Sequence, residues 1–384
     1  MSFFTDVATE MIYPLLPLFL STVLGANASF IGAIEGAAES TAALLKLASG
    51  WWSDKVKKRK PLVVWGYGIA ALARPFTAIA QTATQVLVIR VSDRVGKGIR
   101  SSPRDALLAD STDEASRGRA FGFHAAMDNA GAVLGPLIAF ALLREFHFSL
   151  RHVFWLAAIP GALAFVVLVI AVKEVDRHEE MGHATERLHM SGTRLGRRFW
   201  AYLGVVLLFT LGNSTDAFLL LRANQLGVAV ALAPILWAFF NFVKAILGTT
   251  GGAMSDRFGR KPLIVVGWLI YAAVYFGFAM ATKQWHAWAL FGSYAIFYAL
   301  TEGTEKALVA DLVPKERRGA AYGWFNLAIG LGALPASLIF GAIWDRVSPH
   351  YAFLFGATLA LIAAVGMAIV APVVIRNPAD SQTA

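Results

Sequence analysis

Residues 86–110 read VLVIRVSDRVGKGIRSSPRDALLAD, a stretch as long as a membrane span that nevertheless carries several basic side chains. At about 100° per residue, these side chains share one face of a helix, about 120° wide. Because a charge is costly at bilayer depth unless it faces protein or water, this helix must turn its basic face toward an aqueous cavity or toward acidic partners. The basic stripe consists of Arg90, Arg94, Lys97, Arg100 and Arg104.

The composition is that of a membrane protein. The chain has 384 residues, of which 57% are hydrophobic and only 15% are charged, whereas about 25% of the residues of a soluble domain are charged. The apolar residues occur in blocks as long as a membrane span, so we predict an all-α membrane protein with twelve transmembrane helices. The predicted spans are 6–24, 29–51, 61–81, 85–110, 119–143, 152–173, 199–222, 229–252, 262–282, 287–312, 320–342 and 350–374.

Lysine and arginine are distributed unevenly between the two sides of these spans. Most of them fall on one side, in loops such as residues 55–60 and 315–318 and in the longest connection, residues 173–198. By the positive-inside rule, this side and both chain termini face the cytoplasm, in an inner membrane of the bacterial type. The formal net charge of +9 therefore reflects topology, and we do not expect nucleic acid to be a partner.

Two sequence patterns of the first half recur in the second half. SDKVKKRKPLVVWG recurs as SDRFGRKPLIVVG, and DALLADSTDEASRGRAFGF recurs as KALVADLVPKERRGAAYGW. Because each half has an even number of spans, the two copies share one orientation and form a parallel repeat about a pseudo-two-fold axis, with a binding site expected at their interface. We predict an N-terminal six-helix bundle at 1–173, a cytoplasmic linker at 174–198 and a C-terminal six-helix bundle at 199–384.

The loops that follow the second and eighth predicted spans resemble the signature of a known family. They read GWWSDKVKKRK and GAMSDRFGRK, and they are similar to the pattern G-x-x-x-D-R/K-x-G-R/K-R/K of the major facilitator superfamily. The second copy is complete, whereas the first has Lys57 where glycine is usual and one extra residue. The chain resembles this family over essentially its whole length. The resemblance implies two six-helix bundles that transport a solute by alternating access, without a cofactor.

Two further motifs resemble the same family. Arg90 is followed by Gly96 and Gly98, as in the family's fourth span, although Asp93 replaces the customary glutamine. The fifth predicted span contains GAVLGP at 131–136, which is like a G-x-x-x-G-P motif of antiporter members. This motif favours export of the solute, although two further glycines of the complete motif are absent.

Charged residues at the cytoplasmic ends of the helices predict a latch between the two bundles. We expect ion pairs between the signature loops and the ends of the fourth and tenth spans, which hold the halves together when the protein opens outward. The alternative is simple anchoring at the membrane interface, and the signature glycines are expected to allow close helix packing. The predicted gating residues are Gly50, Asp54, Lys55, Arg59, Asp110, Gly252, Asp256, Arg257, Arg260 and Asp311.

Four carboxyl groups within the predicted spans are candidates for proton coupling. A coupling carboxyl must gain and lose a proton in response to burial and to nearby charges. Asp6 and Glu10 lie one turn apart on one face of the first span, which its two prolines are expected to bend. Glu35 and Asp216 lie in the second and seventh spans. The alternative is that these acids only neutralise the basic stripe, but we expect at least one of the four to couple transport to protons.

The basic stripe has two interpretations. Its cations can bind a carboxylate or phosphate of a substrate, or they can pair with acids of neighbouring helices. We expect pairing for Arg90 and Arg100, and substrate contacts for Lys97 and Arg104. Aromatic residues of the eighth and tenth spans, such as Trp237, are also able to line a pocket, although packing is their commoner role. The predicted substrate-binding residues are Tyr13, Arg90, Arg94, Lys97, Arg104, Asp128, Asn129, Asn213, Glu302 and Glu305.

Together these features predict a proton-coupled secondary transporter that exports a small organic solute. The alternatives are import or exchange of an anionic metabolite through the basic stripe and, more remotely, a membrane receptor or scaffold that does not transport. No Ser/His/Asp spacing, Walker loop or metal motif points to an enzyme or to ATP, and the lack of cysteine excludes thiolate metal sites. The expected partners are the solute, protons and the lipid bilayer, and we expect a monomer.

Overall fold

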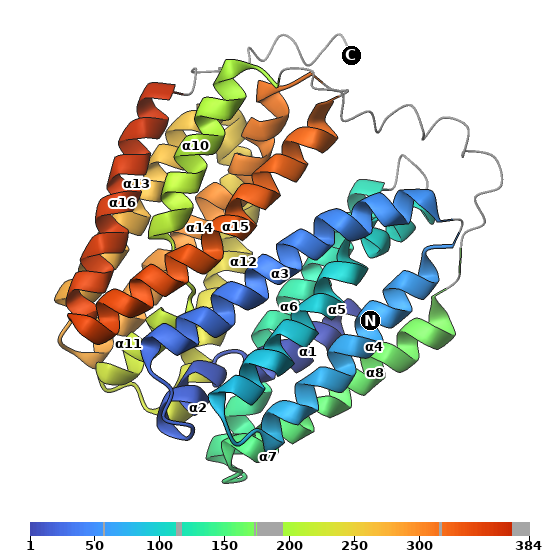
Figure 1. Cartoon of the computed structure of the whole chain (residues 1–384), viewed down its shortest axis with the longest axis vertical. Helices are drawn as coiled ribbons and strands as arrows, with labels where there is room; N and C mark the ends of the chain where they lie inside the picture. The colour runs from blue at the N-terminus through green and yellow to red at the C-terminus, as the bar shows by residue number, and fades with distance from the viewer. Residues whose placement is uncertain (57, 113–116, 173, 175–194, 315–316, 371–384) are drawn as a thin grey trace.

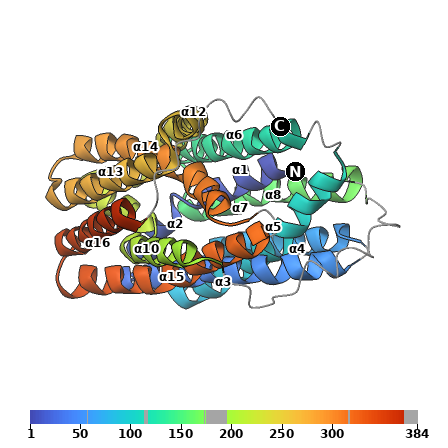
Figure 2. The ribbon, with the colours of Figure 1, turned by 90° about the horizontal axis from the view of Figure 1, so that it is seen from above.

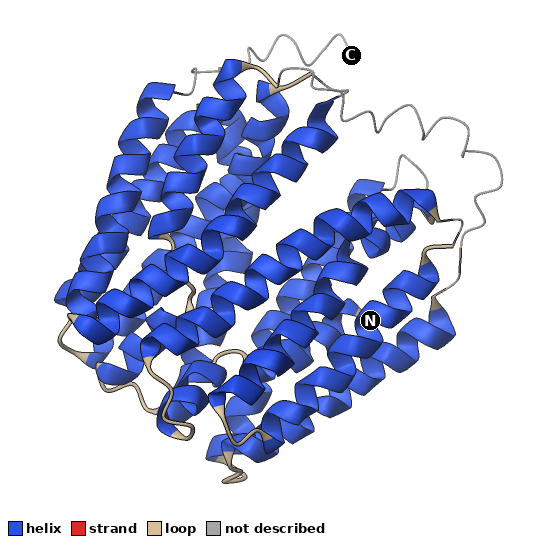
Figure 3. Cartoon of the chain, viewed as in Figure 1, coloured by secondary structure: helices blue, strands red, loops and turns tan. Residues whose placement is uncertain are grey.

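The computed structural model describes residues 1–370 except for 57, 113–116, 173, 175–194 and 315–316. The described residues are almost entirely helical and include no β-strand (Figure 1, Figure 3). Helices are expected because a segment inside a bilayer must satisfy its backbone hydrogen bonds within itself. The predicted all-α class and the predicted twelve spans are confirmed.

The helices group into two bundles of six spans each. The first bundle consists of α1 (Ser2–Ile12) continued by α2 (Leu16–Thr22), α3 (Ala28–Lys55), α4 (Lys60–Ala73) continued by the 3₁₀ helix η1 (Arg74–Ile79), α5 (Ala83–Asp110), α6 (Arg117–Arg144), and α7 (Leu150–Leu156) continued by α8 (Ala158–Ala171). The second consists of α10 (Arg197–Gly212) continued by α11 (Ala217–Gln225), η3 (Val230–Leu232) continued by α12 (Ala233–Phe258), α13 (Arg260–Met280), α14 (Gln284–Leu312), α15 (Arg318–Arg346) and α16 (Pro349–Val370). Most of the predicted linker falls on 175–194, outside the described residues, so the predicted domain boundaries stay a prediction.

The first span of each bundle is interrupted at the same place in the repeat. Residues 13–15 separate α1 from α2, and residues 213–216 separate α10 from α11. Pro14 and Pro17 explain the first break, because proline disrupts the hydrogen-bond ladder of a helix. The second break follows Gly212 and contains no proline. Broken helices at symmetric positions of a repeat are typical of binding sites near the membrane midplane.

Polarity separates the spans into two groups. Nine segments of the described chain are long and apolar enough to cross a membrane by composition alone. The other three spans, α3, α5 and α14, are as long but carry more charged side chains. Because charge at bilayer depth must face protein or water, these three helices are expected to line the interior, and all three contribute to the cavity described below.

The two bundles lie side by side (Figure 1, Figure 2). They contact each other mainly through two helix pairs, in which α3 packs against α15 and α6 packs against α12. In Figure 1 the bundles come together at the end that holds α2, α7 and α11, which we call the converging end. They separate toward the opposite end, where α3 ends and α10 begins, which we call the diverging end.

At the converging end, α3 and α15 approach each other very closely. A Cβ atom on Gly341 would lie only 2.7 Å from the Cα of Ser29, so glycine is required there. The second bundle also caps the start of α3, because the backbone N–H groups of Ala28 and Ser29 donate to the carboxylate of Asp345 over 3.0 and 2.7 Å. A carboxylate is well suited to this place, since a helix N-terminus carries a partial positive charge. These contacts hold the converging end closed.

Five of the ten predicted gating residues lie outside the part that the structure describes. They are Gly252 and the side chains of Asp54, Lys55, Asp110 and Asp256. In the described part, Arg260 Nε lies 3.5 Å from Asp311 Oδ2, and both residues belong to the second bundle. Arg59 Nε donates to the carbonyl of Ser53 over 3.5 Å within the first bundle. The guanidinium of Arg257 lies 5.4 Å from the ring centroid of the next residue, a phenylalanine. Each of these contacts joins residues of one bundle, so a latch between the bundles stays a prediction.

Candidate functional site

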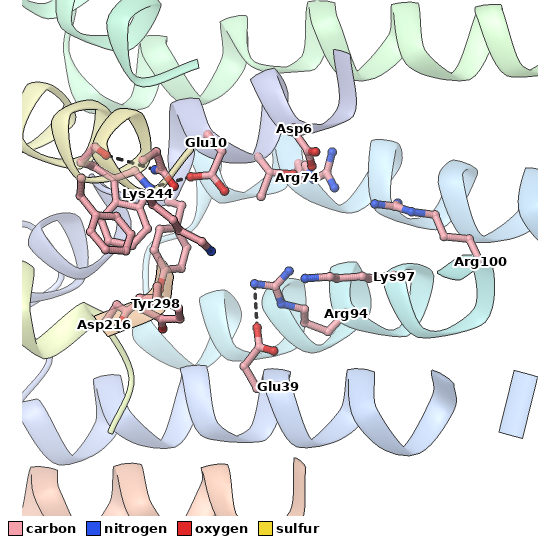
Figure 4. A pocket seen from close by; sticks show the side chains of 15 residues that line it. Asp6, Glu10, Glu39, Arg74, Arg94, Lys97, Arg100, Asp216, Lys244 and Tyr298 are labelled. Atoms are coloured by element: carbon pink, nitrogen blue, oxygen red, sulfur yellow. Dashed lines mark hydrogen bonds and ion pairs between the residues drawn. The ribbon is translucent and has the colours of Figure 1, made fainter. Parts of the chain in front are cut away.

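A cavity of about 310 Å³ lies between the two bundles (Figure 4). Its walls come from the first span, α3, η1 and α5 of the first bundle, and from the seventh span, α12 and α14 of the second. The cavity therefore lies at the interface where the repeat predicts a site. The lining residues are Asp6, Thr9, Glu10, Tyr13, Glu39, Arg74, Arg94, Lys97 and Arg100 from the first bundle, and Asp216, Trp237, Phe240, Asn241, Lys244 and Tyr298 from the second.

Three guanidinium groups of the first bundle surround Asp93, a buried residue of α5. Arg74 Nε donates to Asp93 Oδ1 over 2.9 Å. The other carboxylate oxygen lies 3.8 Å from Arg90 and 3.9 Å from Arg94. This carboxylate, at the position where glutamine is customary in the family's pattern, holds part of the basic stripe inside the protein, where an unpaired charge would be strongly unfavourable.

Arg90 and Glu35 form a bidentate ion pair. Arg90 Nε donates to Glu35 Oε1 over 2.9 Å, and Arg90 Nη2 donates to Oε2 over 2.6 Å. Both residues are buried, and neither lines the cavity. The pairing expected for Arg90 is therefore found. Because one guanidinium occupies both oxygens of Glu35, this acid is poorly placed for the proton coupling that we predicted for it, and Arg90 is poorly placed to touch a substrate.

Arg94 and Lys97 are the part of the stripe that faces the cavity. Arg94 Nη2 lies 3.0 Å from Glu39 Oε1. The side chain of Lys97 is exposed to the cavity and forms no ion pair with any residue that the structure describes. In Figure 4 its ammonium end lies beside the guanidinium of Arg94. Of these two neighbouring cations, only Arg94 forms an ion pair with Glu39.

The last two residues of the stripe have other partners. The guanidinium of Arg100 lies 4.1 Å from the ring centroid of Tyr67, although Arg100 still reaches the cavity wall. Arg104 donates to the carboxylate of its neighbour Asp105 over 2.8 and 3.0 Å, and it does not line the cavity. Our expectation of a substrate contact for Arg104 is not supported, because Asp105 already binds its guanidinium.

The second bundle contributes a carboxylate and an ion pair. Asp216, at the end of the α10–α11 break, accepts a hydrogen bond from the hydroxyl of Tyr294 over 2.6 Å. Lys244 Nζ lies 2.9 Å from Glu302 Oε2 and 4.6 Å from the ring centroid of Tyr298. Glu302, which we predicted to bind substrate, therefore pairs with a cavity lysine without lining the cavity itself.

A hydrogen bond at the cavity joins the two bundles. The indole Nε1 of Trp237 donates to Glu10 Oε2 over 2.7 Å. The ring centroids of Trp237 and Tyr13 are 5.0 Å apart, and Phe240 lies 4.9 Å from Trp237 on the same helix. Packing was the commoner role expected for these aromatic residues of α12, but the structure places them in the cavity wall.

Four further residues of the predicted substrate site lie outside the cavity lining. Asp128 lies 3.5 Å from a histidine of its own helix, and Asn129 is its neighbour in α6. Asn213 accepts a hydrogen bond from a tyrosine hydroxyl over 3.2 Å, and Glu305 accepts one from a tryptophan indole over 2.9 Å. These residues miss the cavity because helical spacing predicts which residues share a face of one helix, but not which neighbouring helix that face contacts.

Conversely, several lining residues were absent from the predicted site. Arg74 and Lys244 are charges inside apolar spans, a signal that marks functional candidates in membrane proteins. Asn241 lies one turn before Lys244 in α12, and Glu39 lies one turn after another acid in α3. Thr9 carries no such signal, and only the packing of the bundles places it at the cavity.

Comparisons with known sequences place the chain among transporters. A protein-family model described as Major Facilitator Superfamily matches residues 1–243 and 201–383. An uncharacterized MFS-type transporter of Methanocaldococcus jannaschii is 33% identical over 368 residues, which cover 94% of this chain and 91% of that protein. The multidrug resistance protein MdtH of Yersinia enterocolitica is 33% identical over 141 residues, which cover 37% of this chain and 35% of that protein.

Solved structures share the fold. A mutant of the nucleoside transporter NupG matches with a TM-score of 0.80 and 14% identity, over 97% of this chain and 98% of that chain. A D-xylose-proton symporter matches with a TM-score of 0.74 and 16% identity, over 97% and 95% of the two chains. At such identities the likeness concerns the fold alone.

Proposed function

The chain belongs to the Major Facilitator Superfamily, and on that premise we propose that it is a proton-coupled secondary transporter that exports a small organic solute by alternating access. The observation that carries the proposal is the charged cavity between the bundles, whose walls come from both halves of the repeat. We further propose that both termini lie in the cytoplasm of a bacterial-type inner membrane, so that the diverging end of the bundles faces the cytoplasm.

The distribution of contacts between the bundles supports alternating access. At the converging end, Asp345 caps α3 and Gly341 allows the two helices to touch. The cavity itself is bridged by the hydrogen bond between Trp237 and Glu10. A rocking motion of the two bundles would have to break the first contacts to open the cavity at the converging end. The structure therefore corresponds to one of the two states that the proposal requires.

The surroundings of Asp6, Glu10 and Asp216 support proton coupling. All three line the cavity, and none forms an ion pair with lysine or arginine in the part of the chain that the structure describes. The donors to Glu10 and Asp216 are neutral, namely the indole of Trp237 and the hydroxyl of Tyr294. A neutral donor can bond a carboxyl oxygen in both protonation states, so these acids can exchange a proton without breaking an ion pair that holds the fold.

Two sets of observations bear on the direction of transport. Export is favoured by the GAVLGP motif of α6 and by the partial likeness to a multidrug resistance protein over 141 residues. A second candidate is import or exchange of an anionic metabolite. It is favoured by Lys97, which faces the cavity without an ion-pair partner among the described residues.

The test uses purified protein in liposomes with a pH-sensitive dye in the lumen. Anionic, cationic and zwitterionic solutes are added outside in turn, and protein-free liposomes control for passive permeation. If the protein is an antiporter, entry of its solute drives protons out, and the lumen becomes alkaline. Acidification that requires the protein would mean symport and would refute export by antiport. Tracer exchange without a pH change would refute proton coupling.

A further inference from the structure

The first-bundle wall of the cavity holds two neighbouring cations of α5, of which only one forms an ion pair among the described residues. Arg94 and Lys97 lie one turn apart on α5 and both face the cavity. Glu39 pairs with Arg94 over 3.0 Å, whereas Lys97 has no ion pair among the described residues. The two side chains carry like charges one turn apart on the same helix, so they repel each other. An anion bound between them would relieve this repulsion.

Two arginines of the same wall flank Lys97 and have donors without a partner in the described part of the chain. Arg94 Nε and Nη1 of Arg100 have no hydrogen-bond partner among the described residues. Arg94 is only 5% exposed and Arg100 only 6%. A buried donor without an acceptor is unfavourable. Both arginines flank Lys97 on α5, three residues away on either side. The guanidinium group of Arg94 lines the cavity beside Lys97, and guanidinium groups match carboxylate and phosphate oxyanions in geometry and charge.

The acids of the cavity are engaged with other groups. Glu10 accepts the indole hydrogen of Trp237, and Asp216 accepts the hydroxyl hydrogen of Tyr294. Asp6 lies beside the carboxyl group of Asp128 on α6. The cavity acids are therefore less available than the cations to bind a charged group of a substrate.

Three of the six lining residues that come from the second bundle are aromatic. The ring centroid of Phe240 lies 4.9 Å from that of Trp237 and 5.7 Å from that of Tyr298. In Figure 4, Tyr298 and Lys97 stand on opposite sides of the cavity. Aromatic walls bind planar or apolar groups through large contact areas. A volume of about 310 Å³ is at the lower end of the range for small-molecule pockets, about 300–1,000 Å³, so the ligand must be small.

We propose that the substrate is a small organic anion, whose carboxylate or phosphate group binds Lys97 and Arg94 and whose apolar or aromatic body packs against Trp237 and Phe240. The proposal rests on transport through this cavity, and it holds for either direction of transport. An amine of the same shape would be repelled by Lys97. A neutral amide would lose the charge-assisted hydrogen bonds that a carboxylate makes.

Binding to the purified full-length protein in lipid nanodiscs tests this assignment. Three probes of one shape are titrated by calorimetry: 2-naphthoate, 2-naphthamide and 2-naphthylmethylamine. We expect 2-naphthoate to bind best. Lys97→Gln should weaken its binding about 10- to 100-fold, as expected for the loss of a hydrogen-bonded charge, while Lys97→Arg should largely retain it. Lys46→Gln is the matched control, because Lys46 also lies on a span of the first bundle but outside the cavity.

Three results would overturn the assignment. They are equal or tighter binding of the amine or the amide by the wild-type protein, binding of 2-naphthoate that Lys97→Gln leaves unchanged, and binding of none of the three probes. The wild-type comparison needs no variant, so it decides the question even if Lys97→Gln does not fold. Binding in nanodiscs requires no gradient, so it is independent of the liposome experiment. If the protein binds anions selectively but causes no pH change in the liposome lumen, proton coupling is refuted and the anionic substrate is not. Proton-coupled movement of cations, without anion binding, would refute the anionic substrate alone.

Discussion

At the level of single residues, the charges of α5 serve two different purposes. Arg90 is buried against Glu35, and the two side chains satisfy each other through two hydrogen bonds. Lys97, two turns further along the same helix face, is exposed to a cavity and has no such partner among the described residues. The first arrangement stabilises the bundle, since a buried charge is tolerable only when it is paired. The second leaves a cation available to a ligand.

The buried pair makes a prediction about stability. Glu35→Gln should destabilise the protein by about 3–5 kcal/mol, because it leaves the guanidinium of Arg90 buried and unpaired. The melting temperature of the purified protein in detergent measures the effect. Glu302→Gln is the matched control, because it removes the same kind of group from a pair whose acid is 50% exposed, and such pairs contribute at most about 1 kcal/mol. Equal melting temperatures for the two variants would contradict the structural role of Glu35.

The same residues show how far sequence reasoning reaches at this scale. Helical periodicity placed the five cations of α5 on one face, and it required acids from other helices to balance them. It did not assign Arg100 to Tyr67 of α4, because periodicity gives the direction of a side chain along one helix and says nothing of the neighbouring helix. The sequence did not predict that the aromatic residues around Trp237 line a cavity. An aromatic residue in a span has the same sequence signal in a cavity as in contact with lipid.

At the level of helices, the glycines of the GAVLGP motif bring α6 against the first span. A Cβ atom on Gly135 would lie 2.7 Å from the carbonyl oxygen of Val7 and 3.0 Å from the Cβ of Glu10. Gly131 meets the first span in the same way, one turn earlier, next to Asp6. Close approach through small residues is a common way for helices to pack in membranes. In this chain the motif fixes the helix that presents Asp6 and Glu10 to the cavity.

Gly135→Val should therefore disturb this contact. The added side chain forces α1 away from α6, at a cost of about 1–3 kcal/mol for overpacking, and it displaces Glu10 from the indole of Trp237. We expect a lower melting temperature and weaker proton-coupled transport in liposomes. Gly122→Val, on the same helix, is the control, because nothing lies within 4 Å of a Cβ atom at Gly122. If both variants behave like the wild-type protein, the motif does not position the first span.

The existence and order of the helices could be read from the sequence more reliably than their interruptions. Each predicted span overlaps a helix or a pair of consecutive helices, because span-length apolar blocks have few alternatives in a bilayer. The break between α1 and α2 follows from Pro14 and Pro17. The break at 213–216 contains no proline, so the sequence does not predict it. It depends on contacts between helices, such as the hydrogen bond between Asp216 and the hydroxyl of Tyr294.

At the level of the whole molecule, the question is what holds the two bundles in the observed arrangement. The repeat makes the two interfaces, α3 with α15 and α6 with α12, equivalent by sequence, but the first is the more extensive and includes a helix cap. Asp345, at the end of α15, accepts hydrogen bonds from the backbone of Ala28 and Ser29 at the start of α3. The residue of α6 that corresponds to Asp345 in the repeat is Arg144, and the acid next to it, Glu145, lies just beyond the helix and is exposed. Closure of the converging end should therefore depend on Asp345 more than on any repeat-related residue.

Asp345→Asn should shift the protein toward opening at the converging end. The amide keeps one neutral acceptor but loses the charge that faces the positive end of α3, and two weakened hydrogen bonds correspond to about a ten-fold change in the equilibrium.

The natural chain contains no cysteine, so Thr9→Cys places a single thiol in the cavity wall. In spheroplasts, a membrane-impermeant maleimide reaches only the outer face, which we propose to be the converging end. Labelling should be about ten-fold faster in the Asp345→Asn background and unchanged with Glu145→Gln. Equal labelling rates in the two backgrounds would mean that the glycine contacts between α3 and α15 suffice to keep the converging end closed.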